Sequence, residues 1–196
     1  MQKRFMNQTL MAEQTVFSFK DLLLQWGQDL TPAQLTAKIN YRVKHGDLYQ
    51  IRRGLYAKNA NYNHLELATK ILTPAYISFE TVLNTAGVNF QYYSQIFVAS
   101  YQTRTIICDG TSYNFKQLKS IVLTNNMGIE SHQNYAMASP ERAFLDTVYL
   151  NTQYHFDNLE PLNWDKINKI LPIYGSNKSM LKRVNLYYQA YKLELK

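Results

Sequence analysis

The chain contains a single cysteine, Cys108, among its 196 residues. One thiol excludes an internal disulfide and any metal site built from several cysteines. We interpret Cys108 as a buried strand residue of a protein that works in a reducing compartment.

Long apolar segments are also missing. The sequence has no run of about 18 consecutive apolar residues, the length that a membrane-spanning helix needs. The first fifteen residues lack the apolar centre of a secretory signal. We therefore expect a soluble, cytoplasmic protein with no membrane partner.

The motifs of common enzyme classes are absent too. We find no Gly-x-Ser-x-Gly elbow, no Gly-x-x-x-x-Gly-Lys-Ser/Thr phosphate loop and no His-Glu-x-x-His metal helix. The four histidines are widely separated. Nucleotidyl transfer would require an Asp-x-Asp after the Gly175-Ser176 step, and none follows it. We expect no enzyme activity, no catalytic residues, no metal site and no cofactor.

Charge is unevenly distributed along the chain. The formal net charge is +7, divided into +5 for residues 1–60, −4 for 61–165 and +6 for 166–196. Basic ends around an acidic middle indicate an anionic partner. Composition alone leaves two kinds of partner open, a nucleic acid and an acidic protein.

The segment 31–58 has the most informative pattern. Thr31 and Pro32 are typical of a helix start, and Gly46 is typical of a helix end. Leu35, Ile39 and Val43 recur every four residues and predict one buried ridge. We expect Lys38 and Arg42 to project from the opposite face, within a polar and basic outward set.

A hairpin is predicted directly after this helix. Residues 48–51 and 55–57 read as strands around a tight Arg52-Arg53-Gly54 turn, and residues 38–58 hold six Lys or Arg against one acid. A helix followed by a basic hairpin is typical of a winged helix-turn-helix, with the helix in the major groove and the wing on the DNA backbone or minor groove. The candidate DNA-binding residues are Gln34, Lys38, Tyr41, Arg42, Lys44, His45, Arg52 and Arg53.

The rest of the chain predicts a second, larger domain. A helix capped by Ser18 and ended by Gly27 completes the first domain, residues 1–60, and the turn-rich stretch 59–63 marks the boundary with residues 61–196. Beyond it we expect helices at 64–72, from Ser78 to Ala86, from Ser139 to Tyr149, at 165–171 and at 178–195. We expect strands at 96–100, 105–108, 113–115 and 120–123, with an Asp109-Gly110 hairpin turn. The expected fold is α+β, with an antiparallel sheet flanked by helices.

Three further side chains stand out on the last helix. Lys178, Lys182 and Arg183 lie within six residues, and we expect them to share one face as a second basic patch.

In the helix that begins with Ser139-Pro140-Glu141, we expect Arg142 to pair with a nearby acid. We interpret Asp146 as a tertiary hydrogen-bonding partner rather than a catalytic carboxylate.

Three short pieces in their order along the chain resemble the AbiEi-type antitoxins, the transcriptional regulators of type IV toxin-antitoxin systems for abortive infection and phage defence. The pieces are Arg53-Gly54-Leu55-Tyr56, the stretch YISFETVLNTAGV (76–88) and the stretch YAMASPERAFLDTVYL (135–150). Thr81-Val82-Leu83 stands where many members have a Ser-Ala-Leu step.

The resemblance implies a DNA-binding repressor that controls its own operon by binding double-stranded operator DNA. It also implies an antitoxin that counteracts a nucleotidyltransferase-like toxin, a role that does not require a stable complex between the two. The alternative that the residues leave open is a protein-binding module whose basic faces inhibit an acidic partner, without specific DNA binding.

Overall fold

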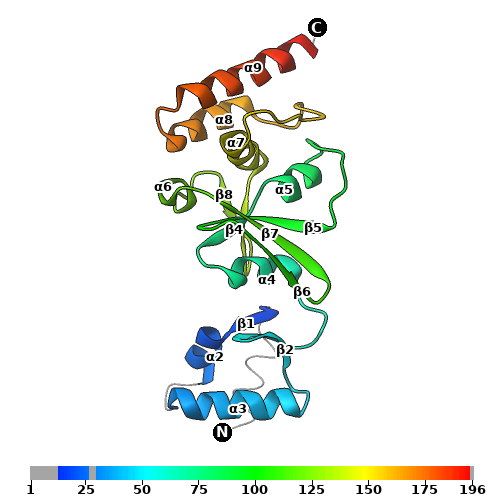
Figure 1. The fold of residues 1–196 in the computed structure, drawn as a ribbon, viewed down its shortest axis with the longest axis vertical. Helices are drawn as coiled ribbons and strands as arrows, with labels where there is room; N and C mark the ends of the chain where they lie inside the picture. The colour runs from blue at the N-terminus through cyan, green and yellow to red at the C-terminus, as the bar shows by residue number, and fades with distance from the viewer. Residues whose placement is uncertain (1–12, 27–29, 195–196) are drawn as a thin grey trace.

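Two β-sheets and the helices that cover them form a mixed α+β structure, which the computed structural model describes over residues 13–26 and 30–194 (Figure 1). Gly27 and Leu195, the expected ends of two helices, lie outside these residues. None of the helices within the described residues is long and apolar enough to cross a membrane.

A three-stranded sheet and two helices form one end of the molecule (Figure 1). Its elements are β1 (Val16–Ser18), α2 (Phe19–Trp26), α3 (Pro32–Lys44), β2 (Tyr49–Arg52) and β3 (Leu55–Ala57). Strand β3 lies in the middle, antiparallel to both neighbours. The sequence pattern had predicted β2 and β3 but not β1.

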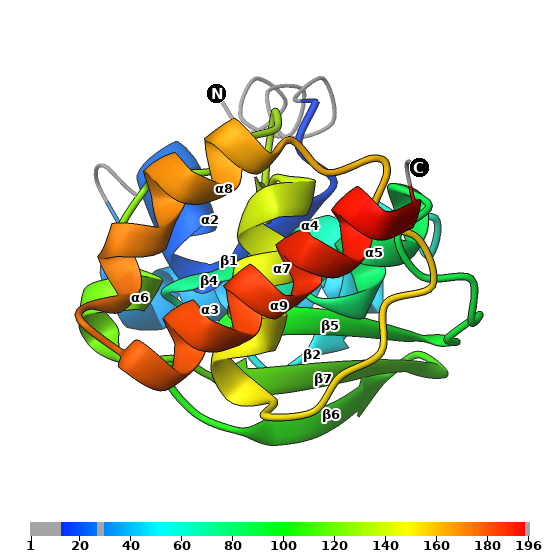
Figure 2. The same ribbon diagram turned by 90° about the horizontal axis from the view of Figure 1, so that it is seen from above.

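A six-stranded sheet of order β6-β7-β5-β4-β9-β8 forms the centre. The elements of this part are α4 (His64–Ile71), β4 (Ala75–Ile77), α5 (Glu80–Thr85), β5 (Gln95–Ser100), β6 (Arg104–Cys108), β7 (Thr111–Gln117), α6 (Ser120–Leu123), β8 (Ile129–Ser131), β9 (Ala136–Ala138), α7 (Pro140–Leu150), α8 (Trp164–Ile170), the 3₁₀ helix η1 (Leu171–Tyr174) and α9 (Lys178–Glu194). Helix α4 lies on the side of the sheet that faces the three-stranded sheet, and α5 and α7 lie on the other side (Figure 1). Helix α9 crosses over α7 (Figure 2).

The expected antiparallel sheet is found in part: three strand pairs are antiparallel, but β5 pairs with β7 and β4 with β9 in parallel. The short connection after β5 does not close a hairpin. Strand β6 instead pairs with β7, and β7 returns between β5 and β6. Two reversals of direction therefore leave β7 parallel to β5.

The Asp109-Gly110 turn joins β6 and β7 as expected. Cys108 pairs with Thr111 across it, and both turn residues have positive φ, 47° and 76°. This is the backbone of a type I′ hairpin turn, which suits the twist of antiparallel strands. Cys108 itself is buried, which agrees with our interpretation.

Two local expectations are wrong. Ser120–Leu123 forms the short helix α6 rather than a strand, with Val122 and Leu123 buried and Ile121 exposed. Ser78 does not cap α5, whose N-cap residue is Phe79. The Ser78 hydroxyl donates instead to Asp146 at 2.8 Å, so a buried tertiary contact takes the place of the local cap.

The centre of the larger part is a buried ion pair between Arg142 and Asp146, whose side chains are both fully buried. Arg142 Nε donates to Asp146 at 3.2 Å, and its four other N–H groups reach the carbonyls of Val122, Asn125 and Met127 and the Tyr76 hydroxyl. Asp146 also accepts from the hydroxyls of Tyr76, Ser78 and Tyr174. The expected pairing of Arg142 with an acid and the expected tertiary hydrogen bonding of Asp146 are confirmed. Burial raises the pKa of Asp146 despite the neighbouring guanidinium.

The three-stranded sheet joins the two parts, because its side chains alternate between them. Phe17 and Tyr56 belong to a small core with residues of α2 and α3. Val16, Leu55 and Ala57 belong to the large core with residues of α4. The central strand β3, whose three residues are all buried, therefore contributes to both cores.

Polar contacts reinforce the same junction. The buried carboxylate of Glu66 accepts from the backbone and hydroxyl of Thr15 and from the backbone of Val16, and Asp21 pairs with Lys70 at 2.9 Å. Asp109 accepts from the hydroxyls of Tyr49 and Tyr62. The boundary at residue 60 stays a prediction, but a fragment cut there would expose Leu55, Ala57 and Val16.

We expect Asp146→Ala to lower the free energy of unfolding by about 3–5 kcal/mol, because it leaves the Arg142 guanidinium buried without its counter-charge. Urea denaturation followed by tryptophan fluorescence measures the loss. Glu160→Ala, which removes an exposed carboxylate, is the matched control and should stay within about 0.5 kcal/mol of the parent. A loss below about 1 kcal/mol for Asp146→Ala would contradict the central role of this pair.

Candidate nucleic-acid interface

Helix α3 is the element on which the candidate interface rests, and it begins as the sequence predicted. The Thr31 hydroxyl accepts from the Gln34 backbone at 3.3 Å, and the Gln34 side chain accepts from the Thr31 backbone at 2.8 Å. This reciprocal pair is a capping box. Gln34, a candidate DNA-binding residue, therefore uses its side-chain oxygen to hold the start of the helix.

The inner side of α3 is also as expected. Leu35 and Ile39 are fully buried in the small core, and Val43 packs at its edge. The helix ends at Lys44, and Gly46 follows with a φ of +76°, the left-handed conformation that suits glycine.

The expectation that Lys38 and Arg42 project opposite the buried ridge is wrong, because both side chains lie half-buried beside it. Lys38 Nζ lies 5.3 Å from the centre of the Trp26 ring, and burial lowers its pKa, helped by the charge of Arg42. Arg42 Nη1 lies 2.7 Å from the carboxylate of Asp47. Each of the two residues directly precedes a ridge residue in the helix, so its side chain lies at the flank of the core.

The other candidates on this helix are exposed. Tyr41 and His45 stack with their ring centres 3.9 Å apart, and Lys44 lies in the exposed last turn. His45 Nδ1 lies 2.8 Å from the Tyr41 carbonyl. Because a carbonyl only accepts, Nδ1 is the donor and Nε2 is the ring nitrogen left to face a ligand.

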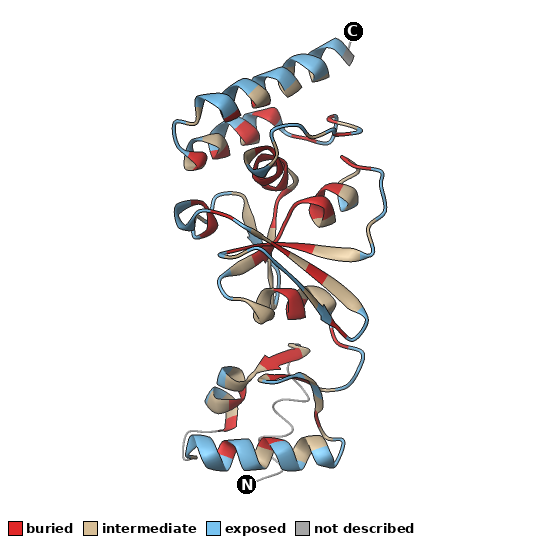
Figure 3. Cartoon of the chain, in the orientation of Figure 1, coloured by how far each residue is buried: buried red, intermediate tan, exposed pale blue. Residues whose placement is uncertain are grey.

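The face of α3 that points away from the core includes three residues that our sequence analysis missed, Ala33, Ala37 and Asn40, all exposed. They recur at helical spacing with Tyr41 and Lys44, so the angular position of each residue on the helix would have found them. Residue type alone does not identify such positions, because alanine carries no polar group. The whole face lies at the end of the molecule (Figure 3).

The arginines of the β2–β3 turn are exposed, as a wing would require. Gly54 takes a φ of +81°, and its carbonyl accepts from the backbone of Phe19 at 2.9 Å. This hydrogen bond fixes the turn beside the start of α2. Arg52 and Arg53 thus extend from an anchored backbone.

The second basic patch does not form as expected. Lys178 and Lys182 are exposed, but Arg183 lies on another side of α9 and bonds the Val148 carbonyl at 2.9 Å. All three lie at the end of the molecule opposite α3 (Figure 1). The two sets of basic residues therefore form separate surfaces.

No group of three or more potential metal ligands occurs within residues 13–26 and 30–194.

Comparisons with known proteins show the fold alone. No protein-family model matches the chain, and no curated protein matches it. Among solved structures, the chain is similar to the crystal structure of the RV2827C protein from Mycobacterium tuberculosis, with 12% sequence identity and a TM-score of 0.51. The match covers 92% of this chain and 73% of that one.

We expect Thr31→Ala to lower the free energy of unfolding by about 1 kcal/mol, because the first turn of α3 loses its capping hydroxyl. Thermal or urea denaturation measures the change. The matched control is Thr36→Ala on the same helix, where the hydroxyl bonds a carbonyl within the helix and its loss should cost less than about 0.5 kcal/mol. Equal stability of Thr31→Ala and the parent would show that the cap contributes nothing.

Proposed function

We propose that the chain is a DNA-binding transcriptional regulator and the antitoxin of a type IV toxin-antitoxin system. In this proposal the first 60 residues act as a winged helix-turn-helix on double-stranded operator DNA. The protein represses its own operon and counteracts a nucleotidyltransferase-like toxin, which does not require a stable complex between the two. It works in the cytoplasm and has no enzyme activity of its own.

One observation carries the DNA-binding part of this proposal. Helix α3 lies at one end of the molecule with an exposed face directed away from both cores, and a hairpin with two exposed arginines belongs to the same small unit. An α-helix fits the width of the major groove of B-DNA. Nothing in the described chain covers this face.

The composition of the face supports close contact with a groove. Ala33 and Ala37 are small, so the helix backbone can approach the bases. Asn40, between them and Lys44, offers an amide donor and an acceptor, the pair of groups that recognises the edge of adenine. We assign base recognition to Asn40 and contact with the phosphates to Lys44, Arg52 and Arg53.

The ion pair with Asp47 changes what we expect of Arg42. A guanidinium that already contacts a carboxylate gains less from a phosphate than an unpaired one. Arg42→Ala should therefore weaken DNA binding less than Lys44→Ala. The main effect of Arg42→Ala should be to loosen the turn after α3, where Asp47 lies.

The antitoxin part rests on the order of the three sequence pieces that resemble the AbiEi-type family. In the structure the piece 135–150 contains the Arg142–Asp146 pair, and the piece 76–88 begins with Tyr76, which bonds both members of that pair. These two pieces thus form the central packing of the larger part. The resemblance to the family supports the biological role, and the packing explains only why these residues are needed for folding.

We expect the protein to bind DNA from upstream of its own gene with an affinity that falls steeply with salt. Lys44→Ala or Arg53→Ala should each lower the slope of log K against log salt by about 1, and Asn40→Ala should instead cost about 1–3 kcal/mol on the preferred sequence and little on unrelated DNA. Fluorescence anisotropy at several salt concentrations measures both effects.

Arg104→Ala is the matched control, because Arg104 is an exposed arginine on β6, outside the small unit. It should leave both affinity and slope unchanged. If the parent shows no binding to DNA even at low salt, the DNA-binding proposal fails. The alternative of a module that inhibits an acidic protein would then be favoured.

We expect co-expression of the protein to restore growth of cells that produce a nucleotidyltransferase encoded beside it, because an antitoxin must offset its own toxin. Colony counts with and without the protein measure this rescue. Asp146→Ala should lose rescue together with folding, whereas Asn40→Ala should lose repression of a promoter reporter but keep rescue. A folded parent protein that gives no rescue would overturn the antitoxin role.

A further inference from the structure

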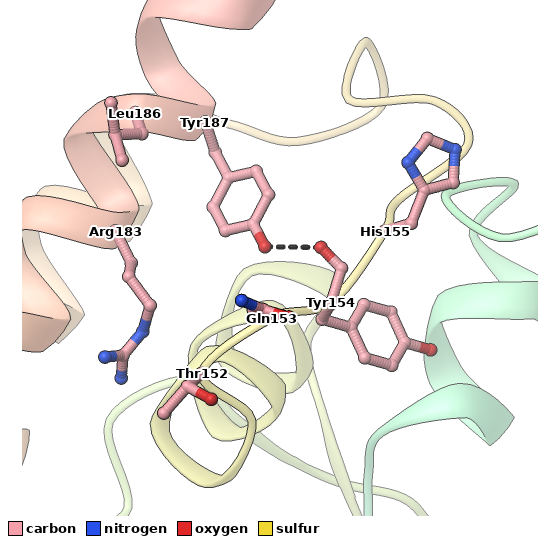
Figure 4. Close-up of a pocket in the computed structure, with 7 residues that line it drawn as sticks. All are labelled: Thr152, Gln153, Tyr154, His155, Arg183, Leu186 and Tyr187. Atoms are coloured by element: carbon pink, nitrogen blue, oxygen red, sulfur yellow. Dashed lines mark hydrogen bonds between the residues drawn. The ribbon is translucent and has the colours of Figure 1, made fainter.

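A hollow of about 540 Å³ lies between α9 and the loop that follows α7 (Figure 4). Residues 152–155 form the side that belongs to the loop, and Arg183, Leu186 and Tyr187 form the side that belongs to α9. No Asp or Glu lines it. The hollow therefore has a positive charge at one side and no negative charge to offset it.

Arg183 differs from the other arginines of the described chain that are at least partly buried. Arg42 and Arg142 each contact a carboxylate. Arg183 donates to two neutral oxygens instead, the Ser179 hydroxyl at 2.8 Å and the Val148 carbonyl at 2.9 Å. Within the described residues, no carboxylate lies within ion-pair distance of it.

One of the three remaining N–H groups of the Arg183 side chain strengthens this point. Its Nε is buried and has no acceptor. A partly desolvated guanidinium that has no counter-charge, and whose Nε–H has no acceptor, gains more than a solvated one from an added anion. Carboxylates and phosphates match the planar fork of arginine donors.

The surroundings add to the positive field. Lys178 and Lys182 line an adjacent hollow on α9 that shares Leu186 with this one. Both lysines are exposed. An anion that approaches this end of the molecule therefore meets a cationic surface before it reaches Arg183.

Size and lining indicate an organic ligand rather than an inorganic ion. The volume lies within the range of sites for small molecules, about 300–1,000 Å³, and a bare phosphate would leave most of it empty. Leu186 is 61% exposed and offers an apolar surface. The Tyr187 ring projects between α9 and the loop, held by its hydroxyl, which donates to the Tyr154 carbonyl (Figure 4).

We propose that this hollow binds a small organic anion, with a carboxylate or phosphate group on Arg183 and a flat apolar body against Tyr187 and Leu186. The side chains of Thr152 and Gln153 supply further hydrogen-bond donors to the charged group. The site lies at the end of the molecule opposite α3 (Figure 1). It stands independently of whether α3 binds DNA.

Benzoate and phenyl phosphate serve as probes on the full-length protein, and benzamide is the uncharged analogue. Calorimetry should show that at least one anion binds ten-fold or more tightly than benzamide. In ¹⁵N-labelled protein, the Nε–H signal of Arg183, assigned by its loss in Arg183→Lys, should shift when the anion is added. A purely structural arginine would show no such shift.

The variants separate charge from packing. Arg183→Gln should abolish the preference for the anion, and Arg183→Lys should keep part of it because the charge remains. The matched control Arg104→Gln removes an exposed arginine on β6 and should bind like the parent. Urea denaturation checks that each variant folds, since Arg183 also ties α9 to Val148.

Several results would overturn the proposal. They are equal binding of the anions and benzamide to the parent, an unmoved Arg183 signal, or an unchanged preference in a folded Arg183→Gln. The first needs no variant and the second needs only Arg183→Lys for the assignment, so the test holds even if Arg183→Gln fails to fold. Binding of a capped acidic peptide that requires Arg183, without binding of either small anion, would overturn it in favour of a protein partner.

Discussion

The larger part of the chain depends on one buried cation. Each of the five N–H groups of Arg142 has an acceptor, and the acceptors come from β4, from the segment 122–127 and from α7 itself. A guanidinium away from water is tolerated only with such complete pairing. The position of Arg142 also restricts which residue can stand in the neighbouring turn. A side chain at Gly128 would place its Cβ 2.9 Å from the Cβ of Arg142 and 2.7 Å from Ile170, so this position requires glycine.

Features set by neighbours in sequence could be read from the chain, and features set by distant partners could not. The capping box at Thr31, the Asp109-Gly110 turn and the start of α7 depend on residues within a few positions, and all three are present. The strand order was not accessible, because the β5–β7 pairing skips the nearest strand in sequence. Ser120–Leu123 forms a helix instead of the expected strand, because a short apolar run of this length fits a strand and a single helical turn equally well.

The candidate interface shows the same division. Residue type identified the basic segment, but angular position on α3 decides which side chains reach solvent. Arg42 and Lys38 directly precede residues of the buried ridge, so each is drawn toward the core flank, where Asp47 and Trp26 lie. The absence of a carboxylate beside Arg183 had no signature in sequence, because it depends on the fold of residues 148–155 against α9.

The sheet of β1, β2 and β3 has a consequence for how such a chain can evolve. The alternate side chains of β1 and β3 belong to two different cores, so neither core is complete without these two strands. Suppose that recombination replaced only the segment with α2, α3 and their sheet by that of another protein. One face of the incoming sheet would then fit the α4 of that other protein instead of the α4 of this chain. Change at this end should therefore accumulate as single substitutions on the outer surface of α3, while the strands and α4 diverge together.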